Sequence, residues 1–461
     1  KEIITSLFGY GSFDSESVFQ EESLSAIVDE IELERHQSQL KSKTTLRELR
    51  RLRNSSSLRI GILIVSSIEK PWKLLFLPLT FPWLLFSIGL ERLGKKSPPQ
   101  IDYELGMPAE KRNSVVFFPT NGVGFGHFTR MYALAKRMKR DDPDLEIVFF
   151  TTMPTVHLLY QEGYITYHLS GRKKHGEMSS SQWNALVEEN LSLVFSHHNP
   201  EIFIFDGAFP YRGMLNAIKG RTDMQKLWMR RGTFRKGSKV PIDSIAHFDL
   251  LIHPEDSVAM QTSQLNHGVK ELTCPPITLL DENELMTRES ALRRLGIEQT
   301  AKVVYVQLGA GRINDIDSEV RMTINSLLEN NCKVVVGESM LGDRLNIDIE
   351  GVIVIRDYPN SMYFNAFDAT VQAGGYNSYH ETRRFGLPAL FYPNMNTGMD
   401  DQLARCNVSS QEGWGIVVEN RTEENIANGV KSLLALKIID LPKQKNGADV
   451  LSLVLNKQLT S

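Results

Sequence analysis

The sequence predicts an α/β protein with two doubly wound units in tandem, preceded by a helical extension. From residue 114 onwards, short apolar runs alternate with amphipathic helical patterns, which is typical of βαβ units and a parallel sheet. The alternation stops at Cys274-Pro275-Pro276 and starts again near residue 301, and 461 residues are too many for one ordinary domain. We therefore expect four parts: a helical extension (1–99), a first sheet domain (100–275), a second sheet domain (276–440) and a C-terminal helix (441–461) that packs back on the first domain.

The composition is that of a soluble globular protein, with 41% hydrophobic and 23% charged residues. A net charge of −3 gives no reason to expect nucleic-acid binding. The three cysteines are far apart and form neither a metal-binding spacing nor a disulfide framework, so we expect a reducing compartment. The first residues show no signal-peptide pattern, and we expect no secretory peptide.

The extension combines a basic helical pattern with an apolar segment. Residues 21–53 have apolar positions at helical spacing, and their second half is basic, which fits either a solvated helix face or a helix beside anionic lipid. Residues 72–90 carry one charge, Lys73, and two prolines that would break a straight helix. This segment fits an interfacial helix pair, a hairpin packed on the globular body, or a true membrane span. We expect residues 41–97 to associate with a membrane surface.

The first sheet domain opens with a strand and a glycine turn. Gly122, Gly124 and Gly126 follow the strand, and His127 lies in the first turn of the next helix. The G-x-G-x-G spacing differs from the dinucleotide fingerprint, and no acidic residue closes the second strand, which argues against a dehydrogenase. A helix N-terminus disfavours the imidazolium ion, so His127 is suited to act as a general base; alternatively, it caps the turn or packs across a cleft. Predicted strands cover 115–119, 146–151, 201–205, 226–230 and 250–253, and predicted helices cover 129–139 and 183–196.

Two more polar residues end predicted strands of this domain. Asp206 could orient His127 or accept a substrate hydroxyl, or it could cap a helix or hydrogen-bond to a loop. Arg230 could meet a phosphate or an anionic acceptor, although such arginines are as often surface residues. With Gly124 and Gly126, Arg230 forms the candidate acceptor or phosphate side.

The second domain repeats the strand-to-glycine arrangement. Gly309, Gly311 and Arg312 follow its first strand, and their backbone N–H groups could face a diphosphate. Arg356 and Tyr358 follow a later strand and could line a base pocket. Predicted strands cover 301–308, 333–336, 352–355, 369–372, 389–392 and 415–419, and predicted helices cover 316–330, 362–367, 379–385, 422–436 and 448–458.

The strongest candidate site is the stretch 371–405. A strand ends at Gly374-Gly375, and Tyr376, Asn377 and Ser378 then lead into a helix, an arrangement that presents backbone N–H groups and a hydroxyl to a diphosphate.

Three further polar residues of this stretch could hold a nucleotide sugar. Glu381 lies one helical turn after Ser378, which fits either a capping box or a carboxylate that binds ribose hydroxyls. Asp401 and Gln402, beyond the next strand, offer groups that can grip sugar hydroxyls.

The segments GGYNSYHE, RRFGLPALFYP and DDQ of this stretch resemble the donor-binding domain of GT-B glycosyltransferases. The resemblance is to the lipid-linked N-acetylglucosaminyltransferase of peptidoglycan synthesis and to UDP-glucuronosyltransferase-like enzymes, and the loop ending at His127 resembles the N-terminal loop of the same group. It covers roughly residues 114–436 and implies two Rossmann-like domains, the first for an acceptor and the second for a nucleotide-sugar donor. The loop departs from the group's pattern, because it contains GVGFGH where GGTGGH is more usual.

The resemblance also implies roles for particular residues. By position, Glu381 would bind the nucleotide ribose, His127 would be the base or an acceptor-site residue, Gly375, Asn377 and Ser378 would hold the diphosphate, and Asp401 and Gln402 would contact the donor sugar. The implied reaction is an inverting transfer from a UDP-sugar to an acceptor hydroxyl, with no cofactor and no metal. The basic helix and the apolar segment of the extension suggest a glycolipid, polyprenyl-linked or glycan acceptor, and we expect the protein at the cytoplasmic face of a membrane. A nucleotide-sugar 2-epimerase and a non-catalytic subunit of a polysaccharide assembly complex remain alternatives.

Overall fold

The structure, a computed structural model, divides into two units, Lys1–Glu104 and Leu105–Ser461. The predicted basic helix at 21–53, and Gly122, Gly311 and Arg312 of the predicted glycine turns, lie outside the residues that it describes. The described residues are 56–69, 71–92, 113–120, 124–176, 178–230, 242–258, 268–309, 317–340, 347–396, 400–436 and 441–459.

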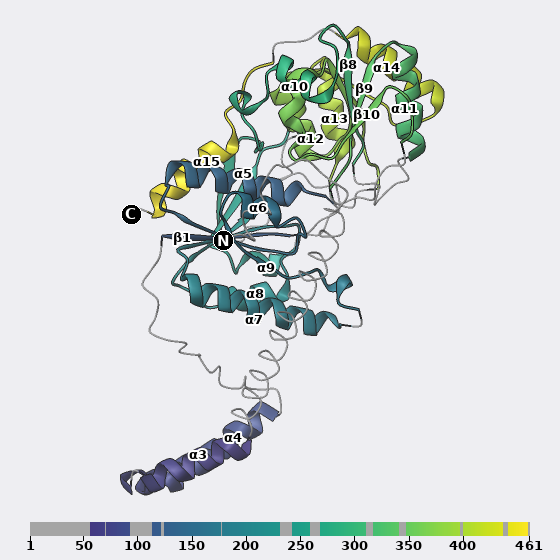
Figure 1. The fold of residues 1–461 in the computed structure, drawn as a ribbon. Helices are drawn as coiled ribbons and strands as arrows, with labels where there is room; N and C mark the ends of the chain where they lie inside the picture. Colours follow the sequence, from purple (N-terminus) through teal and green to yellow (C-terminus); the bar gives the residue numbers. More distant parts are fainter. Residues whose placement is uncertain are drawn as a thin grey trace, which may run out of the picture. The chain divides into compact units, whose positions relative to one another are not determined.

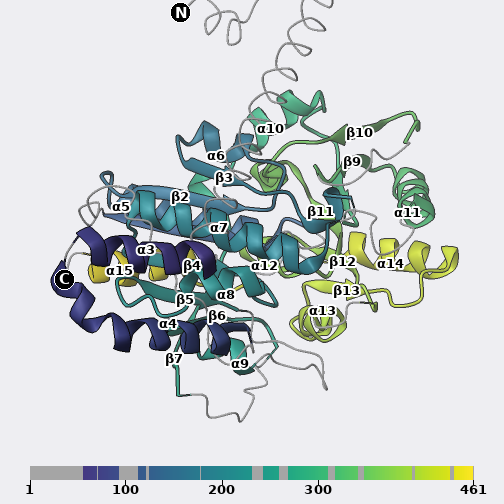
Figure 2. The ribbon, with the colours of Figure 1, turned by 90° about the horizontal axis from the view of Figure 1, so that it is seen from below.

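The first unit contains a helical hairpin. Helix α3 (Ser56–Glu69) is followed by a short 3₁₀ helix, η1 (Pro71–Phe76), and by α4 (Leu77–Arg92), and α3 and α4 lie side by side (Figure 2). Helix α4 continues through Pro82, so this proline does not end the helix. Large apolar side chains are exposed along all three elements: Ile64, Val65, Ile68, Trp72, Leu75, Phe76, Leu79, Trp83, Leu85 and Phe86. In the described part of the chain, no helix has the length and apolar character needed to cross a membrane.

The first sheet has seven parallel strands in the order β3-β2-β1-β4-β5-β6-β7. Strand β1, which lies inside the sheet between β2 and β4, is buried at all six residues, as a strand covered on both faces must be. Figure 1 shows α5 and α15 on one face and α7 and α8 on the other. The strands are β1 (Ser114–Pro119), β2 (Glu146–Thr151), β3 (Ile165–His168), β4 (Ile202–Asp206), β5 (Gln225–Met229), β6 (Leu250–Pro254) and β7 (Lys270–Cys274). The helices are α5 (Gly126–Asp141), α6 (His157–Gln161), η2 (Arg172–Lys174), α7 (Ser180–His198), α8 (Arg212–Ile218) and α9 (Ile242–Ile245).

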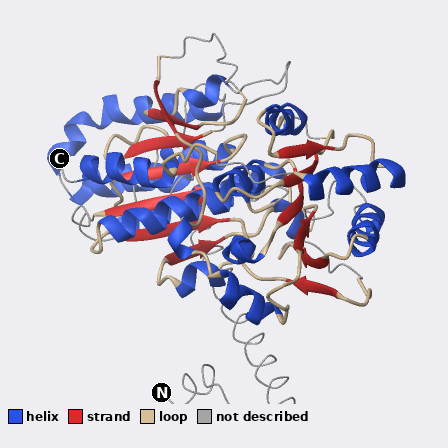
Figure 3. Ribbon diagram, turned by 90° about the horizontal axis from the view of Figure 1, so that it is seen from above, coloured by secondary structure: helices blue, strands red, loops and turns tan. Residues whose placement is uncertain are grey.

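The second sheet has six parallel strands in the order β10-β9-β8-β11-β12-β13. Figure 3 shows the strands of both sheets between layers of helices. The predicted helix at 362–367 is instead the 3₁₀ helix η4 (Asn360–Ala366). The strands are β8 (Val303–Gln307), β9 (Lys333–Gly337), β10 (Val352–Ile355), β11 (Ala369–Ala373), β12 (Ala389–Tyr392) and β13 (Gly415–Val417). The helices are η3 (Glu282–Glu284), α10 (Arg288–Leu295), α11 (Asp317–Glu329), α12 (Tyr376–Arg384), α13 (Gln402–Gln411) and α14 (Glu423–Ala435).

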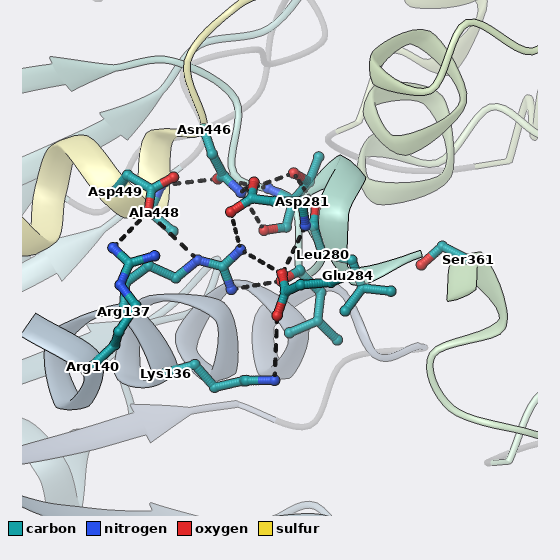
Figure 4. Close-up of polar contacts among 12 residues, drawn as sticks. Lys136, Arg137, Arg140, Leu280, Asp281, Glu284, Ser361, Asn446, Ala448 and Asp449 are labelled. Atoms are coloured by element: carbon teal, nitrogen blue, oxygen red, sulfur yellow. Dashed lines mark hydrogen bonds and ion pairs between the residues drawn. The ribbon is translucent and has the colours of Figure 1, made fainter. Parts of the chain in front are cut away.

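The linkers between the sheets are held by one buried arginine on α5. The guanidinium of Arg137 donates to Leu279 O at 2.7 Å, Asp281 Oδ2 at 2.9 Å and Glu284 Oε2 at 3.2 Å (Figure 4). Asn446 Nδ2 donates to Asp281 Oδ1 at 3.0 Å, so the linker segments on either side of the second sheet meet at the same carboxylate. Charge-assisted hydrogen bonds are the strong ones, and these tie both linker segments to α5 of the first sheet.

The C-terminal helix α15 (Gly447–Leu459) returns to the first sheet. Leu451 and Leu455 are fully buried in the core that α5 shares with this sheet. Ser452 Oγ donates to Asp141 Oδ2 at 2.6 Å. The chain therefore ends on the domain where its first strand lies.

Candidate functional site

A cavity of about 540 Å³ lies between the carboxyl ends of the two sheets, where ligands of doubly wound sheets bind. Its walls come from the glycine turn after β1 on one side and from the segments after β8 to β12 on the other. Several predicted site residues line it: Gly124, Gly126, His127, Gly309, Tyr358, Gly375, Tyr376, Asn377, Ser378, Glu381 and Gln402. Others do not: Asp206, Arg230, Arg356, Gly374 and Asp401.

His127 and Asp206 lie in hydrogen-bond contact. His127 is the second residue of α5, and Asp206 ends β4, whose register pairs Pro119 of β1 with Asp206. The distance from His127 Nδ1 to Asp206 Oδ1 is 2.6 Å, and the side chains are 18% and 1% exposed. Of the alternatives that the sequence left open for Asp206, the structure has it orienting His127.

The ionisation of Asp206 determines which imidazole tautomer is present. Burial raises the pKa of Asp206, but the charges of Arg130 and His127 and their hydrogen bonds outweigh it, so the pKa lies below its ordinary value. An ionised carboxylate only accepts hydrogen bonds, so His127 Nδ1 must carry the proton. In the neutral ring the lone pair is then on Nε2, as a general base requires.

On the opposite wall, α12 begins at Tyr376, with Gly375 as its N-cap residue and no side-chain cap. Ser378 is therefore the third residue of the helix, so the capping box considered for Ser378 and Glu381 is absent. The first N–H groups of a helix have no partner within it, and those of this helix come from residues that line the cavity. Gly374 has a packing role, because a Cβ there would clash with Cys406 Sγ.

Glu381 lines the cavity from the same helix and is partly buried. Ser361 Oγ donates to its Oε1 at 3.4 Å. Burial raises the pKa of Glu381 to about 7, and the weak bond from Ser361 opposes this only in part. Hydrogen bonds from the hydroxyl groups of a ligand would stabilise the ionised form of such a carboxylate.

The predicted sugar contacts divide between two roles. Asp401 caps α13, because its side chain accepts from Ala404 N at 3.1 Å. Asp400 and Gln402 line the cavity. Gln402 Oε1 accepts from Asn394 N at 2.9 Å, which holds the loop after β12 against the start of α13.

The predicted base-pocket residues also differ in position. Tyr358 is in the cavity wall, where it stacks on Phe125 with 5.0 Å between ring centroids and its hydroxyl lies 2.9 Å from Thr129 Oγ1. Arg356 is not a lining residue; its Nη1 lies 3.7 Å from Oε2 of Glu338, which does line the cavity. Arg230 is buried over the ring of Trp228, away from the cavity, and burial lowers its pKa to about 10.

Sequence reasoning missed a buried ionic network that joins the two domains. Arg405 of α13 donates to both carboxylate oxygens of Asp256, which follows β6 of the first sheet, at 2.8 and 2.6 Å. Arg405 also donates to Asp400 Oδ1 at 2.6 Å, and His380 Nε2 lies 3.2 Å from Asp256 Oδ1. Asp256 could have been singled out in the sequence because, like Asp206, it is a carboxylate near the end of an apolar strand.

Sequence reasoning also missed Arg130. It lies one turn after His127 on α5, and its guanidinium donates to both oxygens of Asp206. The spacing of three residues on one helix was the available signal.

The described residues contain no group of three or more His, Cys, Asp or Glu side chains that could hold a metal ion. No protein-family model matches the chain. No curated protein matches it either.

The fold is that of several solved structures. The UDP-GlcNAc 2-epimerase from Methanocaldococcus jannaschii is similar with a TM-score of 0.51 and 10% identity, over 75% of this chain and 99% of that one. The calicheamicin glycosyltransferase CalG4 has a TM-score of 0.50 and 14% identity, over 76% and 98%. The spinosyn forosaminyltransferase SpnP has a TM-score of 0.50 and 13% identity, over 76% and 95%. These likenesses confirm the predicted GT-B arrangement of two Rossmann-like sheet domains.

Proposed function

We propose that this protein is a glycosyltransferase that moves a sugar from a UDP-sugar to a hydroxyl of a membrane-linked or glycan acceptor. The observation that carries the proposal is the cavity, because it brings His127, held by Asp206, opposite the helix start at Tyr376 and Glu381. A base on one wall and an anion site on the other are the two parts that a transfer across the cleft needs.

In the proposed reaction, the acceptor hydroxyl oxygen attacks the anomeric carbon of the donor. The bond from that carbon to the diphosphate oxygen breaks, and the hydroxyl proton moves to His127 Nε2. Asp206 accepts the hydrogen bond from His127 Nδ1 and so leaves Nε2 as the nitrogen that takes the proton. The first N–H groups and the positive end of α12 stabilise the leaving diphosphate without a metal ion. Attack from the side opposite the leaving group inverts the anomeric centre.

For the donor, Glu381 would accept hydrogen bonds from the ribose hydroxyls, and Asp400 and Gln402 would contact the sugar. The choice of UDP is supported by the sequence resemblance. The test is a screen of UDP-, GDP- and dTDP-sugars that measures released nucleoside diphosphate in the presence of lipid-linked acceptors. Release from a GDP- or dTDP-sugar alone would overturn the choice of UDP, and release from none would overturn the transfer.

An epimerase is the second candidate, because a UDP-GlcNAc 2-epimerase shares the fold. The two functions differ in their need for an acceptor. Incubation of the protein with UDP-N-acetylglucosamine alone, followed by separation of the sugars, distinguishes them. A 2-epimer formed without acceptor would support the epimerase and contradict the transferase.

The membrane part of the proposal concerns the hairpin α3–η1–α4. Its exposed apolar residues include two tryptophans, Trp72 and Trp83, a residue type that favours the lipid–water interface. The flanking sequence is basic, with six Lys or Arg between residues 41 and 53, which suits anionic lipid. We propose that the hairpin lies in the interface at the cytoplasmic face of a membrane that carries the lipid-linked acceptor.

Co-sedimentation with vesicles that contain anionic lipid tests the hairpin. The full-length variant Leu79→Ser/Trp83→Ser/Phe86→Ser removes exposed apolar area that would be worth roughly 1.5–3 kcal/mol per side chain when buried. We expect this variant to stay in the supernatant. Leu193→Ser, at an exposed leucine of α7, is the matched control and should pellet like the wild type. Equal pelleting of all three proteins would contradict the proposal.

A further inference from the structure

The cluster behind His127 contains a third member that a base and its orienting carboxylate do not require. Arg130 Nη2 donates to Asp206 Oδ1 at 2.8 Å, and Nε donates to Oδ2 at 3.0 Å. Oδ1 therefore accepts from Arg130 and His127 together. The Arg130 and Asp206 side chains are 2% and 1% exposed, so solvent hardly screens the pair.

The position of the guanidinium also brings a positive charge to the ring itself. Arg130 Nη2 lies 3.0 Å from His127 Nδ1. Nδ1 already donates its proton to the carboxylate, so it cannot accept a hydrogen bond from Arg130. The nearby guanidinium charge is therefore unfavourable for the imidazolium ion. A buried carboxylate alone would strongly favour the imidazolium ion, whereas a carboxylate paired with a guanidinium has almost no net charge to offer.

Other charged or titratable groups also face this cluster, and they come from several elements. The guanidinium carbon of Arg130 lies 5.4 Å from the ring centroid of Tyr376 on α12. The carboxylate of Asp400 also interacts electrostatically with this guanidinium. Cys274, at the end of β7, also lies within the field of Arg130. Arg405 lies on the Tyr376 ring at 5.7 Å and pairs with Asp400, so this carboxylate is itself neutralised. Arg130 is thus a positive charge in direct contact with the His127 ring, and it opposes protonation of that ring.

We propose that Arg130 is a positioning residue that neutralises Asp206 and so keeps the His127 imidazole uncharged and ready to accept a proton at neutral pH. The inference rests on the role of His127 in the function proposed above. Its physical content, the charge state of one imidazole, can be measured without turnover.

The test compares three full-length variants with the wild type: Arg130→Gln, Arg130→Lys and Arg130→Gln/Asp206→Asn. Proton NMR follows the titration of the His127 ring, whose signal is identified by its absence in His127→Gln. Loss of the guanidinium should raise the midpoint of that titration by roughly 1 pH unit or more. Arg130→Lys keeps the charge, so its midpoint should stay close to the wild-type value.

The double variant covers the case in which Arg130→Gln does not fold, because it leaves no unpaired buried charge. It removes both charges of the pair, so its midpoint should also stay near the wild-type value. A folded Arg130→Gln with an unchanged midpoint would overturn the proposal, and so would a double variant with a midpoint raised by 1 unit or more.

The pH profile of kcat/KM is the second readout. In Arg130→Gln its acidic limb should move up by the same amount as the His127 midpoint. A wild-type protein that turns over no nucleotide sugar would contradict the proposed function and leave the titration result intact. A shifted titration beside an unshifted kcat/KM profile would contradict His127 as the base.

Discussion

Replacement of Glu381 by Gln should stabilise the free protein at alkaline pH and weaken nucleotide binding. The carboxyl group is partly buried in the cavity wall, and burial raises its pKa from 4.5 to about 7. A pKa that is higher in the folded than in the unfolded chain means that the folded state loses stability as the pH rises from 4.5 to 7. The loss is complete above the folded pKa. Gln has the same shape and no such loss.

The size of the effect follows from the shift. A change from 4.5 to about 7 corresponds to roughly 3 kcal/mol when Glu381 is fully ionised, as an upper limit for a partly exposed group. Between pH 5 and pH 8, linkage gives a difference of about 2.5 kcal/mol. The melting temperature of Glu381→Gln should therefore exceed that of the wild type by several degrees at pH 8 and by much less at pH 5.

The assay is thermal unfolding at both pH values, with Glu298→Gln, an exposed glutamate, as matched control. Calorimetry with UDP completes it, because loss of a charged acceptor for two ribose hydroxyls should weaken binding by roughly 10-fold or more. The reasoning is refuted if the difference between Glu381→Gln and the wild type is the same at pH 5 and pH 8. It is also refuted if UDP binds both proteins equally.

Three further outcomes are expected. His127→Ala should lower kcat by roughly 100-fold or more while UDP affinity in calorimetry stays the same, and full kcat would remove the base assignment. Asp401→Ala should lower the free energy of unfolding by about 1 kcal/mol, because the cap of α13 is lost, and should have little effect on the KM for the donor. Gln402→Ala should raise the KM for the donor. If Asp401→Ala raised that KM and Gln402→Ala did not, the sugar contact would belong to Asp401. Chelation with EDTA should leave nucleoside diphosphate release unchanged, and loss of activity that Mg²⁺ restores would contradict metal independence.

The sequence offered the contact between His127 and Asp206 as one of several alternatives for Asp206. Both residues follow apolar strands, and the carboxyl ends of parallel strands meet at one edge of a sheet. The structure pairs β1 directly with β4, so the two side chains meet. The glycine turn before α12 was also predicted, but the helix begins at Tyr376, three residues before the predicted start at 379.

Two strands of the first sheet, β3 and β7, were not predicted from the sequence. Strands β3 and β7 are at the two edges of the first sheet, where exposed and partly exposed residues interrupt the apolar pattern that marks a strand. Adjacent acidic residues were also ambiguous: Asp400 lines the cavity, whereas Asp401 caps α13.

The sequence by itself determined the two sheet domains, the glycine turns and the residues at the strand ends, because periodicity and chain breakers are local properties. Only the tertiary structure decided which charges meet. Arg405 pairs with Asp256 across the two domains, and Arg130 neutralises Asp206, which lies 76 positions further along the chain. Such contacts depend on how α5, the linkers and α15 fix the loops of one sheet against those of the other, and no local pattern encodes that orientation.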